Sequence, residues 1–245
     1  MKEALVVGGA NGIGLAIAME LADRTDMRCV HIVDKAPLAE KYKKDNVRSY
    51  EFDLTQADYS FFDRFDTIDT LFISAGFGRL ALFKDIDEAL ISTYFSVNTI
   101  ASMRILKHFY SKIERAEPFY CGTMVSISGY LSSPFFSVYG ATKAAMRFFI
   151  ESVNVELAKA GTTNRILNVS PGSIKGTSFN QSETDLEQTH SLACQIIEHL
   201  HNRSDLFIPQ YEEIFKNVIA RYQEDFRAEG MRSYDYKVSS GRIKS

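Results

Sequence analysis

The chain has 245 residues, of which 45% are hydrophobic and 24% charged, and its formal net charge is −3. These values are typical of a soluble globular protein with one α/β domain or two small ones. The charge has no basic excess, and no Lys/Arg-rich block stands beside exposed aromatic residues, which argues against nucleic acid as a partner.

The N-terminal residues pass directly into a short apolar run and lack the pattern of a signal peptide. No apolar run reaches the roughly 18 to 20 residues that a membrane span requires. The three cysteines, Cys29, Cys121 and Cys194, are scattered and have no C-x-x-C spacing, which indicates reduced thiols. We expect them to be small core residues and the protein to be cytoplasmic.

Short apolar runs alternate with longer segments of helical periodicity, which predicts parallel strands joined by crossover helices. The predicted strands are 4–7, 29–33, 47–52, 70–74, 119–125, 165–169 and a final short one at 207–209. The predicted helices are 13–22, 85–113, 139–159 and an amphipathic segment at 212–226. Residues 58–65 are too few for a full crossover helix, so that connection should be a turn or two.

No linker or repeat interrupts this alternation, so residues 1–245 are predicted to form a single α/β domain. Its expected core is a doubly wound parallel sheet with helices on both faces. Residues 173–205 are more polar and follow the sixth strand at the sheet edge where ligands usually bind, which predicts a substrate lid. Residues 230–245 should form a polar C-terminal tail.

A glycine-rich turn connects the first strand to the first helix and contains Gly8, Asn11, Gly12, Ile13 and Gly14. Glycines permit a tight turn and let a pyrophosphate approach backbone N–H groups at the positive end of the helix. The turn therefore predicts a dinucleotide site, against the plainer interpretation of a packing turn.

Asp34 ends the second strand, twenty residues after Gly14, where a carboxylate can accept hydrogen bonds from both ribose hydroxyls of an adenosine. The same carboxylate would repel a 2′-phosphate, so we favour NAD, with NADP as the alternative. Lys35, next in the chain, weakens that preference.

Tyr139 and Lys143 are four residues apart on a predicted helix, so both side chains share one face. A nearby ammonium favours the phenolate and would lower the pKa of Tyr139 toward the working range. Ser126 lies thirteen residues upstream and would donate to an oxygen that gains negative charge. Ser128 ends the same strand and is the alternative, although the spacing and Gly129 favour Ser126.

Taken in order, these motifs resemble the short-chain dehydrogenase/reductase family over nearly the whole chain. The matching positions are the glycine turn, Asp34, Asp53, Ser74-Ala75-Gly76, Asn98, Ser126, Tyr139 with Lys143, and Pro171-Gly172. The resemblance implies a Rossmann-like NAD(P)-binding fold and hydride transfer between a secondary alcohol and a ketone.

The resemblance also implies a role for each catalytic position. Tyr139 would exchange the proton of the substrate oxygen, and Lys143 would lower the Tyr139 pKa and hold the nicotinamide ribose. Ser126 would hydrogen-bond the carbonyl, and Asn98 would hold a water that links Lys143 to solvent. The implied cofactor contacts are Gly8, Asn11, Gly12, Ile13, Gly14, Asp34, Asp53, Leu54, Ser74, Ala75, Gly76, Tyr139, Lys143, Pro171, Gly172, Ile174 and Thr177.

Three departures from the family pattern affect fine geometry. Val7 precedes the first glycine where the family often has Thr, and Ile73-Ser74 stands where it usually has Asn. The threonine expected after Pro171-Gly172 falls on Gly176, and Thr177 comes one place late.

Glu198, His199 and His201 are not expected to bind a metal, because two His residues two positions apart point to different faces of a helix. We expect no catalytic metal.

The aromatic residues Phe77, Tyr130, Phe135 and Phe136 are predicted either to frame an apolar or extended substrate or to pack in the core or a subunit contact. A homodimer or homotetramer is expected, with 85–113 and 139–159 as contact helices. Two other functions stay open: a catalytically silent dinucleotide-binding sensor, and an epimerase or dehydratase that uses bound NAD.

Overall fold

The computed structural model describes residues 2–177, 179, 183–240 and 243. Its centre is a seven-stranded, wholly parallel sheet with the strand order β3-β2-β1-β4-β5-β6-β7. The strands are β1 (Lys2–Val7), β2 (Met27–Asp34), β3 (Val47–Glu51), β4 (Thr70–Ile73), β5 (Tyr120–Met124), β6 (Ile166–Val169) and β7 (Leu206–Phe207). This confirms the predicted doubly wound sheet, and each strand lies within two residues of its predicted bounds.

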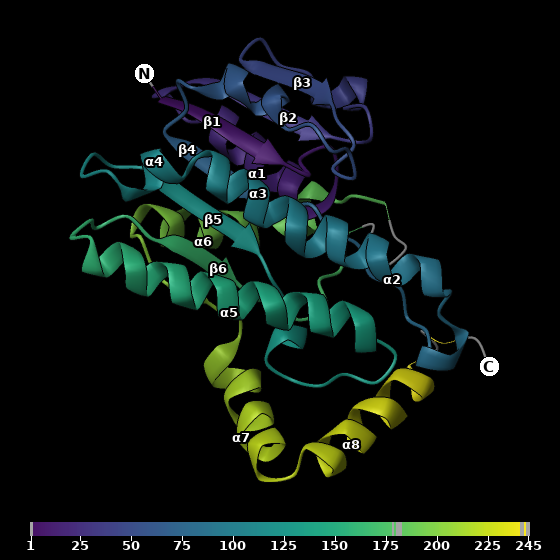
Figure 1. Ribbon diagram of the computed structural model, residues 1–245. Coiled ribbons are helices and arrows are strands. Elements are labelled where there is room, and N and C mark those ends of the chain that lie inside the picture. The colour runs from purple at the N-terminus through teal and green to yellow at the C-terminus, as the bar shows by residue number, and fades with distance from the viewer. Residues whose placement is uncertain (1, 178, 180–182, 241–242, 244–245) are drawn as a thin grey trace.

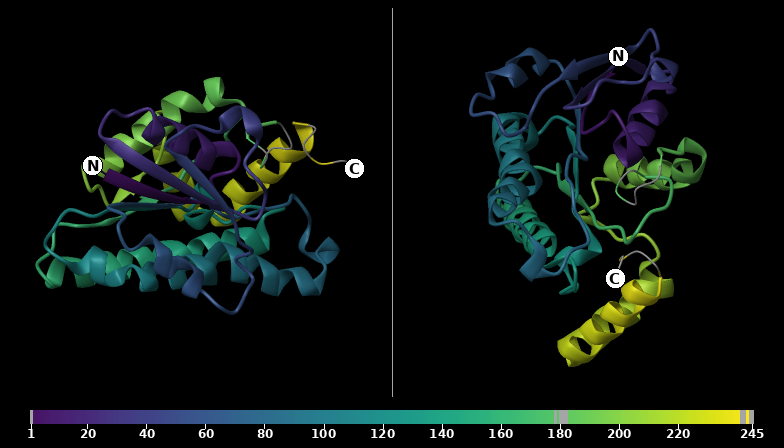
Figure 2. Two further views of the ribbon diagram at one scale, coloured as in Figure 1. Left: turned by 90° about the horizontal axis from the view of Figure 1, so that it is seen from above. Right: turned by 90° about the vertical axis from the view of Figure 1, so that its right-hand side faces the viewer.

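Helices cover both faces of the sheet (Figures 1 and 2). They are α1 (Gly12–Ala22), α2 (Glu88–Phe95), α3 (Ala101–His108), α4 (Tyr110–Glu114), α5 (Ser137–Lys159), α6 (Leu186–His201), α7 (Lys216–Glu224) and α8 (Phe226–Ser239). Helices α1 and α6 lie on one face, and α3, α4 and α5 lie on the other. The last two helices form a hairpin that projects from the body, as Figure 2 shows at the right.

Strand β1 shows why the layers form. Leu5 and Val7 pack in the core with the helices α3, α4 and α5, whereas Ala4 and Val6 pack with α1 and α6. Successive side chains of a strand point to opposite faces, so a strand covered on both faces must be apolar throughout. Ala4, Leu5, Val6 and Val7 are indeed fully buried.

The connection after β3 is short, as predicted. Residues Ser60–Phe65 form a 3₁₀ helix, η2, in place of a crossover helix. Phe62 and Phe65 are buried beneath it and close that side of the core.

Three predicted segments differ from the structure. The helix expected at 85–113 is divided into α2, α3 and α4, with a π-helical turn, η4 (Ser96–Ile100), between the first two. About half of the expected lid at 173–205 is helix α6, whose apolar side is buried against the core with α1. The expected polar tail is helical through Ser239, because Asp225 caps α8 by accepting from the N–H groups of Arg227 and Ala228. Residues 178, 180–182, 241, 242, 244 and 245 of these two segments lie outside the described residues.

Candidate active site

A cleft of about 2610 Å³ lies at the carboxyl ends of the strands. The chain order of the sheet reverses between β1 and β4, and ligands of open α/β sheets bind at such a switch point. All predicted site residues line this cleft except Gly14, Asn98 and Lys143. Those three lie directly behind its wall, as the contacts below show.

The glycine turn after β1 has a backbone that only glycine fits. Gly8 has φ +79°, and a Cβ on it would lie 2.4 Å from the Ala75 nitrogen. A Cβ on Gly14 would lie 2.1 Å from the Gly8 carbonyl oxygen, so Gly14 packs the helix onto the turn and does not line the cleft. Without these side chains, the start of α1 faces the cleft with its N–H groups, which suits a pyrophosphate.

The segment before α6 reaches this turn. Thr184 Oγ1 accepts a hydrogen bond of 2.8 Å from the Gly12 N–H, the first residue of α1. Thr184 was not predicted as a site residue, because its separation of 172 positions from Gly12 leaves no local sequence signal. Its hydroxyl shows that an oxygen acceptor fits at the start of α1.

Asp34 ends β2 beside the glycine turn. One carboxylate oxygen accepts from the Ala10 N–H at 3.0 Å and the other accepts from the Ala36 N–H at 3.0 Å. Both predicted carboxylates, Asp34 and Asp53, therefore line the same end of the cleft. They hold the position in which a ribose diol would meet negative charge.

Lys35 is paired with Asp53 at 2.9 Å. Hydrogen bonds from the Thr55 backbone, from Lys35 and from the Thr55 hydroxyl lower the pKa of Asp53 to about 2, so that it is ionised at neutral pH. The carboxylate thus balances the ammonium that stands next to Asp34. Lys41 is a further cation in the lining of the same end.

Tyr139 and Lys143 lie on α5 and are 8% and 3% exposed. Lys143 Nζ is 5.7 Å from the centre of the Tyr139 ring and donates to the Met124 carbonyl at 2.9 Å. Burial lowers the pKa of Lys143 to about 8. Burial raises the pKa of Tyr139 to about 12, which a hydrogen bond with Ser126 partly opposes. The pair is brought together as predicted, but the expected fall in the Tyr139 pKa is not found, because desolvation is the largest effect on the phenol.

Ser126 follows β5, and its side chain partly opposes the rise in the Tyr139 pKa, which favours it over Ser128. Its hydroxyl also accepts from the Ser128 N–H at 3.1 Å, which starts the 3₁₀ turn η5 (Ile127–Gly129). A Cβ on Gly129 would lie 2.9 Å from the Lys143 carbonyl oxygen. The glycine therefore allows the turn that carries Ser126 to approach α5 closely.

Asn98 occupies the π turn η4 and is 1% exposed. Its amide donates to the Phe77 carbonyl at 2.9 Å and to Thr142 Oγ1 at 3.2 Å, and its Oδ1 accepts from the Phe77 N–H at 2.9 Å. A Cβ on Gly76 would lie 3.2 Å from Asn98 Oδ1 and 3.3 Å from Lys143 Nζ. Asn98 thus joins the loop after β4 to α5 beside the lysine, a positioning role that the sequence did not reveal.

The loop after β6 forms the opposite wall. Pro171, Gly172, Ile174 and Thr177 line the cleft, and Thr177 donates to the Ile174 carbonyl at 3.0 Å. A Cβ on Gly172 would lie 2.6 Å from the Phe215 ring, so this glycine lets the segment before α7 close over the loop.

Two of the four predicted aromatic residues, Phe77 and Phe136, line the cleft. Phe135 is 5% exposed and packs on Tyr234, and the Tyr130 hydroxyl accepts from the Asn168 amide at 3.1 Å. Phe179, which the sequence did not single out, lies 5.3 Å from the Tyr139 ring, centre to centre.

The helical hairpin α7–α8 supplies the outer edge of the cleft. Lys237 on α8 donates to the Pro134 carbonyl at 2.8 Å, which fastens the hairpin to the loop before α5. Glu229 accepts from Arg221 at 2.8 and 3.0 Å and from Arg232 at 2.8 Å, which joins the two helices. Arg221, Glu229, Arg232 and Lys237 line the cleft. The sequence missed this role, because Arg221 lies in a segment predicted only as an amphipathic helix and Arg232 and Lys237 lie in the predicted polar tail.

The histidines weighed for a metal lie apart from the cleft. His199 approaches the Ser204 hydroxyl at 3.1 Å and stacks on Phe207, whereas the His201 ring meets the edge of Tyr120.

Of the cysteines, Cys121 is buried as expected, Cys29 is half-buried and Cys194 is exposed, so the prediction of a core residue is wrong for Cys194. No helix in the described part of the chain is long and apolar enough to cross a membrane.

Known proteins resemble this chain in sequence and in fold. The family model described as short chain dehydrogenase matches residues 2–188. An uncharacterized oxidoreductase of Staphylococcus epidermidis is 27% identical over 196 residues, which are 74% of this chain and 83% of that protein.

Two solved structures share the fold. A short chain dehydrogenase/reductase from Burkholderia phymatum in complex with NAD superposes with a TM-score of 0.77 at 17% identity, over 93% of this chain and 95% of that one. A short chain dehydrogenase from Burkholderia cenocepacia in complex with NADP gives 0.76 at 19% identity, over 95% and 99%. The matched family model covers most of the chain, and the protein belongs to the short-chain dehydrogenase/reductase family.

Proposed function

We propose that the protein is an NAD-dependent oxidoreductase that interconverts a secondary alcohol and a ketone, with Tyr139 as the acid/base. The observation that carries this proposal is the buried group of Tyr139, Ser126 and Lys143 at the wall of a cleft that the glycine-rich turn also lines. The nicotinamide, when bound, supplies or accepts the hydride.

The residues present fit a dinucleotide. Side chains at Gly8 and Gly14 would collide with the backbone of the turn, and the start of α1 lines the cleft beside Asp34. Gly8, Asn11, Gly12 and Ile13 would hold the pyrophosphate, and Asp34 the adenosine ribose. The side chains of Asp53 and Leu54 would border the adenine, and the segments that contain Ser74 and Ile174 would border the nicotinamide half.

The three buried polar groups divide the chemistry of the substrate oxygen. Ser126 donates a hydrogen bond to that oxygen as negative charge builds on it, and Tyr139 gives it a proton in reduction or removes one in oxidation. Lys143, held by the Met124 carbonyl, places a cation beside the phenol and favours its deprotonation. Asn98 positions Lys143 and the loop that contains Gly76. It would also hold a water molecule that links Lys143 to solvent as a proton relay.

Two observations and one electrostatic argument support NAD over NADP. Asp34 lies beside the turn, its carboxylate would repel a 2′-phosphate, and the adjacent Lys35 is already paired with Asp53. The alternative, NADP, would draw on Lys41 in the same end of the cleft.

The test is an assay of secondary alcohols and ketones, with NAD and NADP compared by the absorbance of the reduced nicotinamide. Tyr139→Phe should lower kcat about 10²- to 10⁴-fold and leave the Kd of NAD unchanged, because only the proton exchange is removed. Tyr130→Phe, which removes a hydroxyl outside the cleft lining, is the matched control. If nucleotide binds, no carbonyl or alcohol turns over, and Tyr139→Phe changes nothing in cells, the sensor function replaces this proposal.

Asp34→Ala should weaken NAD more than NADP, with Asp45→Ala, an exposed carboxylate outside the cleft, as its control. An unchanged ratio of the two Kd values contradicts the assignment of NAD.

A further inference from the structure

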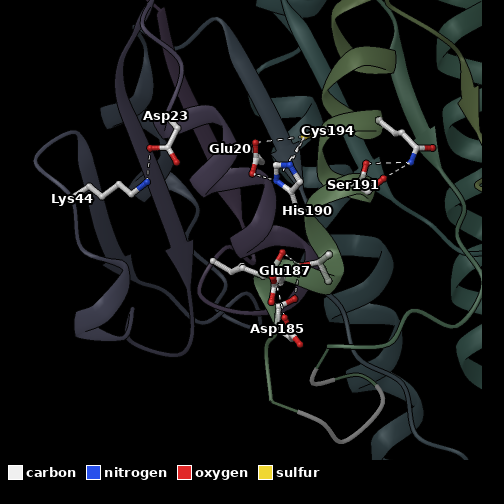
Figure 3. A network of polar contacts seen from close by, with 11 residues as sticks. Glu20, Asp23, Lys44, Asp185, Glu187, His190, Ser191 and Cys194 are labelled. Atoms are coloured by element: carbon white, nitrogen blue, oxygen red, sulfur yellow. Dashed lines mark hydrogen bonds and ion pairs between the residues drawn. The ribbon is translucent and has the colours of Figure 1, made fainter.

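Glu20, His190 and Cys194 lie together on the surface formed by α1 and α6, on the sheet face opposite α5 (Figure 3). Candidate ligand atoms from the three side chains all lie within 4.8 Å of one another. The chemistry proposed for the cleft uses none of them. We propose that these three side chains bind a zinc-like divalent cation, with water completing a four-coordinate site.

The helix geometry brings the three ligands together for simple reasons. His190 and Cys194 are four residues apart on α6, so they lie one above the other on the same face. Small buried residues, Ala16 on α1 and Ala193 on α6, belong to the core cluster between the two helices. Small side chains allow a short distance between helix axes, which brings Glu20 of α1 within reach of the two side chains on α6.

Two of the ligand-to-ligand distances are close to those of a tetrahedral site. Cys194 Sγ lies 3.6 Å from Glu20 Oε2 and 3.8 Å from His190 Nε2. Zinc binds sulfur at about 2.3 Å and nitrogen or oxygen at about 2.0–2.2 Å, so neighbouring ligands around it are roughly 3.3–3.6 Å apart. The carboxylate is therefore already at the required distance, and the imidazole needs a shift of a few tenths of an ångström.

The ligand types select the class of cation. A thiolate and an imidazole favour zinc and other borderline-soft metals, whereas magnesium and calcium require oxygen ligands. The His190 side chain is 60% exposed and that of Glu20 28%, so the site is open to solvent and leaves room for a water ligand. Three protein ligands with one open position is an arrangement that zinc adopts elsewhere.

Binding exchanges protons for the cation. Without a cation, Cys194 Sγ donates a hydrogen bond to Glu20 Oε2. The Glu20 carboxylate also approaches His190 Nδ1 at 2.6 Å. A cation among the three groups takes the place of these hydrogen bonds: Sγ binds it as thiolate, and the thiol proton passes to solvent.

The expected consequence is a cross-link between α1 and α6. The first helix begins at Gly12 in the glycine turn, and α6 follows Thr184, which bonds to Gly12. A cation at Glu20 would join the same two helices about two turns further along. Because the cation binds the folded chain, it should raise the melting temperature by mass action.

The test is titration of chelator-treated protein with cobalt(II) and zinc chloride. We expect one equivalent of cobalt to give a thiolate-to-metal charge-transfer band together with the visible spectrum of a four-coordinate ion. Cys194→Ser should abolish the charge-transfer band, and Glu20→Gln and His190→Gln should each weaken zinc binding by at least about 100-fold. At zinc concentrations about 100 times the Kd, the Tm of the wild type should rise by about 5 °C.

Cys29→Ser and His199→Gln are the matched controls, since each removes a residue of the same type outside the cluster, and neither should change zinc affinity. Unchanged circular dichroism and NAD binding in the three ligand variants would show that they fold. The proposal is overturned if cobalt gives no thiolate band, or if the three ligand substitutions leave zinc affinity as it is in the controls. Neither outcome depends on turnover, so a failure here leaves the proposed oxidoreductase function untouched.

Discussion

At the scale of single residues, Lys143 shows the free-energy cost of burying a cation in the wall of the cleft, away from water. It is 3% exposed, its ammonium donates to one backbone carbonyl, and burial lowers its pKa from 10.5 to about 8. A fall of that size corresponds to about 3 kcal/mol of unfavourable free energy in the charged folded state. The lysine is therefore expected to lower stability in exchange for a charge beside Tyr139.

Replacing this lysine tests that cost. Lys143→Met should abolish turnover but raise Tm at pH 7 by about 5 °C, because the buried charge is removed. The pKa of Lys143 is lower in the folded than in the unfolded protein, so the unfolded state binds more protons between about pH 8 and 10.5. The free energy of unfolding of the wild type therefore rises with pH over that range. The advantage of the variant should thus be full below pH 8 and vanish near pH 10.5. Urea unfolding at several pH values measures it.

Lys159→Met is the control on the same helix, at an exposed position. It should show no such pH dependence. A Lys143→Met protein that is less stable than wild type at pH 7 would contradict the assigned burial cost.

At the scale of elements, the short turns decide where the helices meet the cleft. Gly8 and Gly161 both have positive φ, of +79° and +86°, but only Gly8 has close neighbours. A Cβ on Gly161 would meet nothing within 4 Å, whereas one on Gly8 would meet Ala75 at 2.4 Å. Substitutions at these two glycines therefore distinguish the cost of backbone strain, which both share, from the cost of a steric clash, which only Gly8 has.

Gly161→Ala should cost about 1 kcal/mol of unfolding free energy, the strain of a left-handed residue alone. Gly8→Ala should cost clearly more and should also weaken NAD at least about 10-fold, because the turn must move away from the loop after β4. Chemical denaturation and NAD titration measure both effects. Equal costs for the two variants would show that the close approach at Gly8 is unimportant.

The α7–α8 hairpin depends on a charged contact at the edge of the cleft. Glu229 is 9% exposed, and its pKa is lowered by hydrogen bonds from Arg221 and, to a smaller extent, Arg232. These bonds stabilise the hairpin at neutral pH, and their contribution falls as Glu229 becomes protonated in acid.

Glu229→Gln should loosen the hairpin and raise KM for the alcohol or ketone about 3- to 10-fold, a loss of about 1 kcal/mol given the exposure of both arginines. The Kd of NAD should stay constant, since the nucleotide turn lies at the other end of the cleft. Steady-state kinetics and hydrogen exchange of Phe226–Ser239 measure the two effects. Glu224→Gln, at an exposed position of α7, should change neither.

At the scale of the whole molecule, one helix presents an apolar surface outside the core. Phe148 and Val155 on α5 are 62% and 70% exposed and lie seven residues apart, on one face. Ile100, in the π turn before α3, is 48% exposed. We propose that α5 and the segment around Ile100 form the contact of a homodimer or homotetramer, which the family resemblance also implies.

Phe148→Glu should convert that oligomer to monomers, because a carboxylate would lose its hydration in an apolar contact. Multi-angle light scattering after size exclusion measures the mass. Lys159→Glu is the control on the same helix. A wild-type monomer of 27.7 kDa at micromolar concentration would exclude the contact.

Sequence alone determined the sheet, the glycine turn and the order of the candidate catalytic groups along the chain. Strands buried on both faces must be apolar runs, and the motif around Tyr139 and Lys143 depends on the period of a helix, so both signals are local. Tertiary structure decided the break of the predicted long helix at Asn98, because that side chain bonds to Phe77 and Thr142 far along the chain. It also decided the raised pKa of Tyr139, the reach of Thr184 to Gly12 and the meeting of Glu20 with α6. Burial and contacts between distant segments are set by packing, for which the sequence has no local pattern.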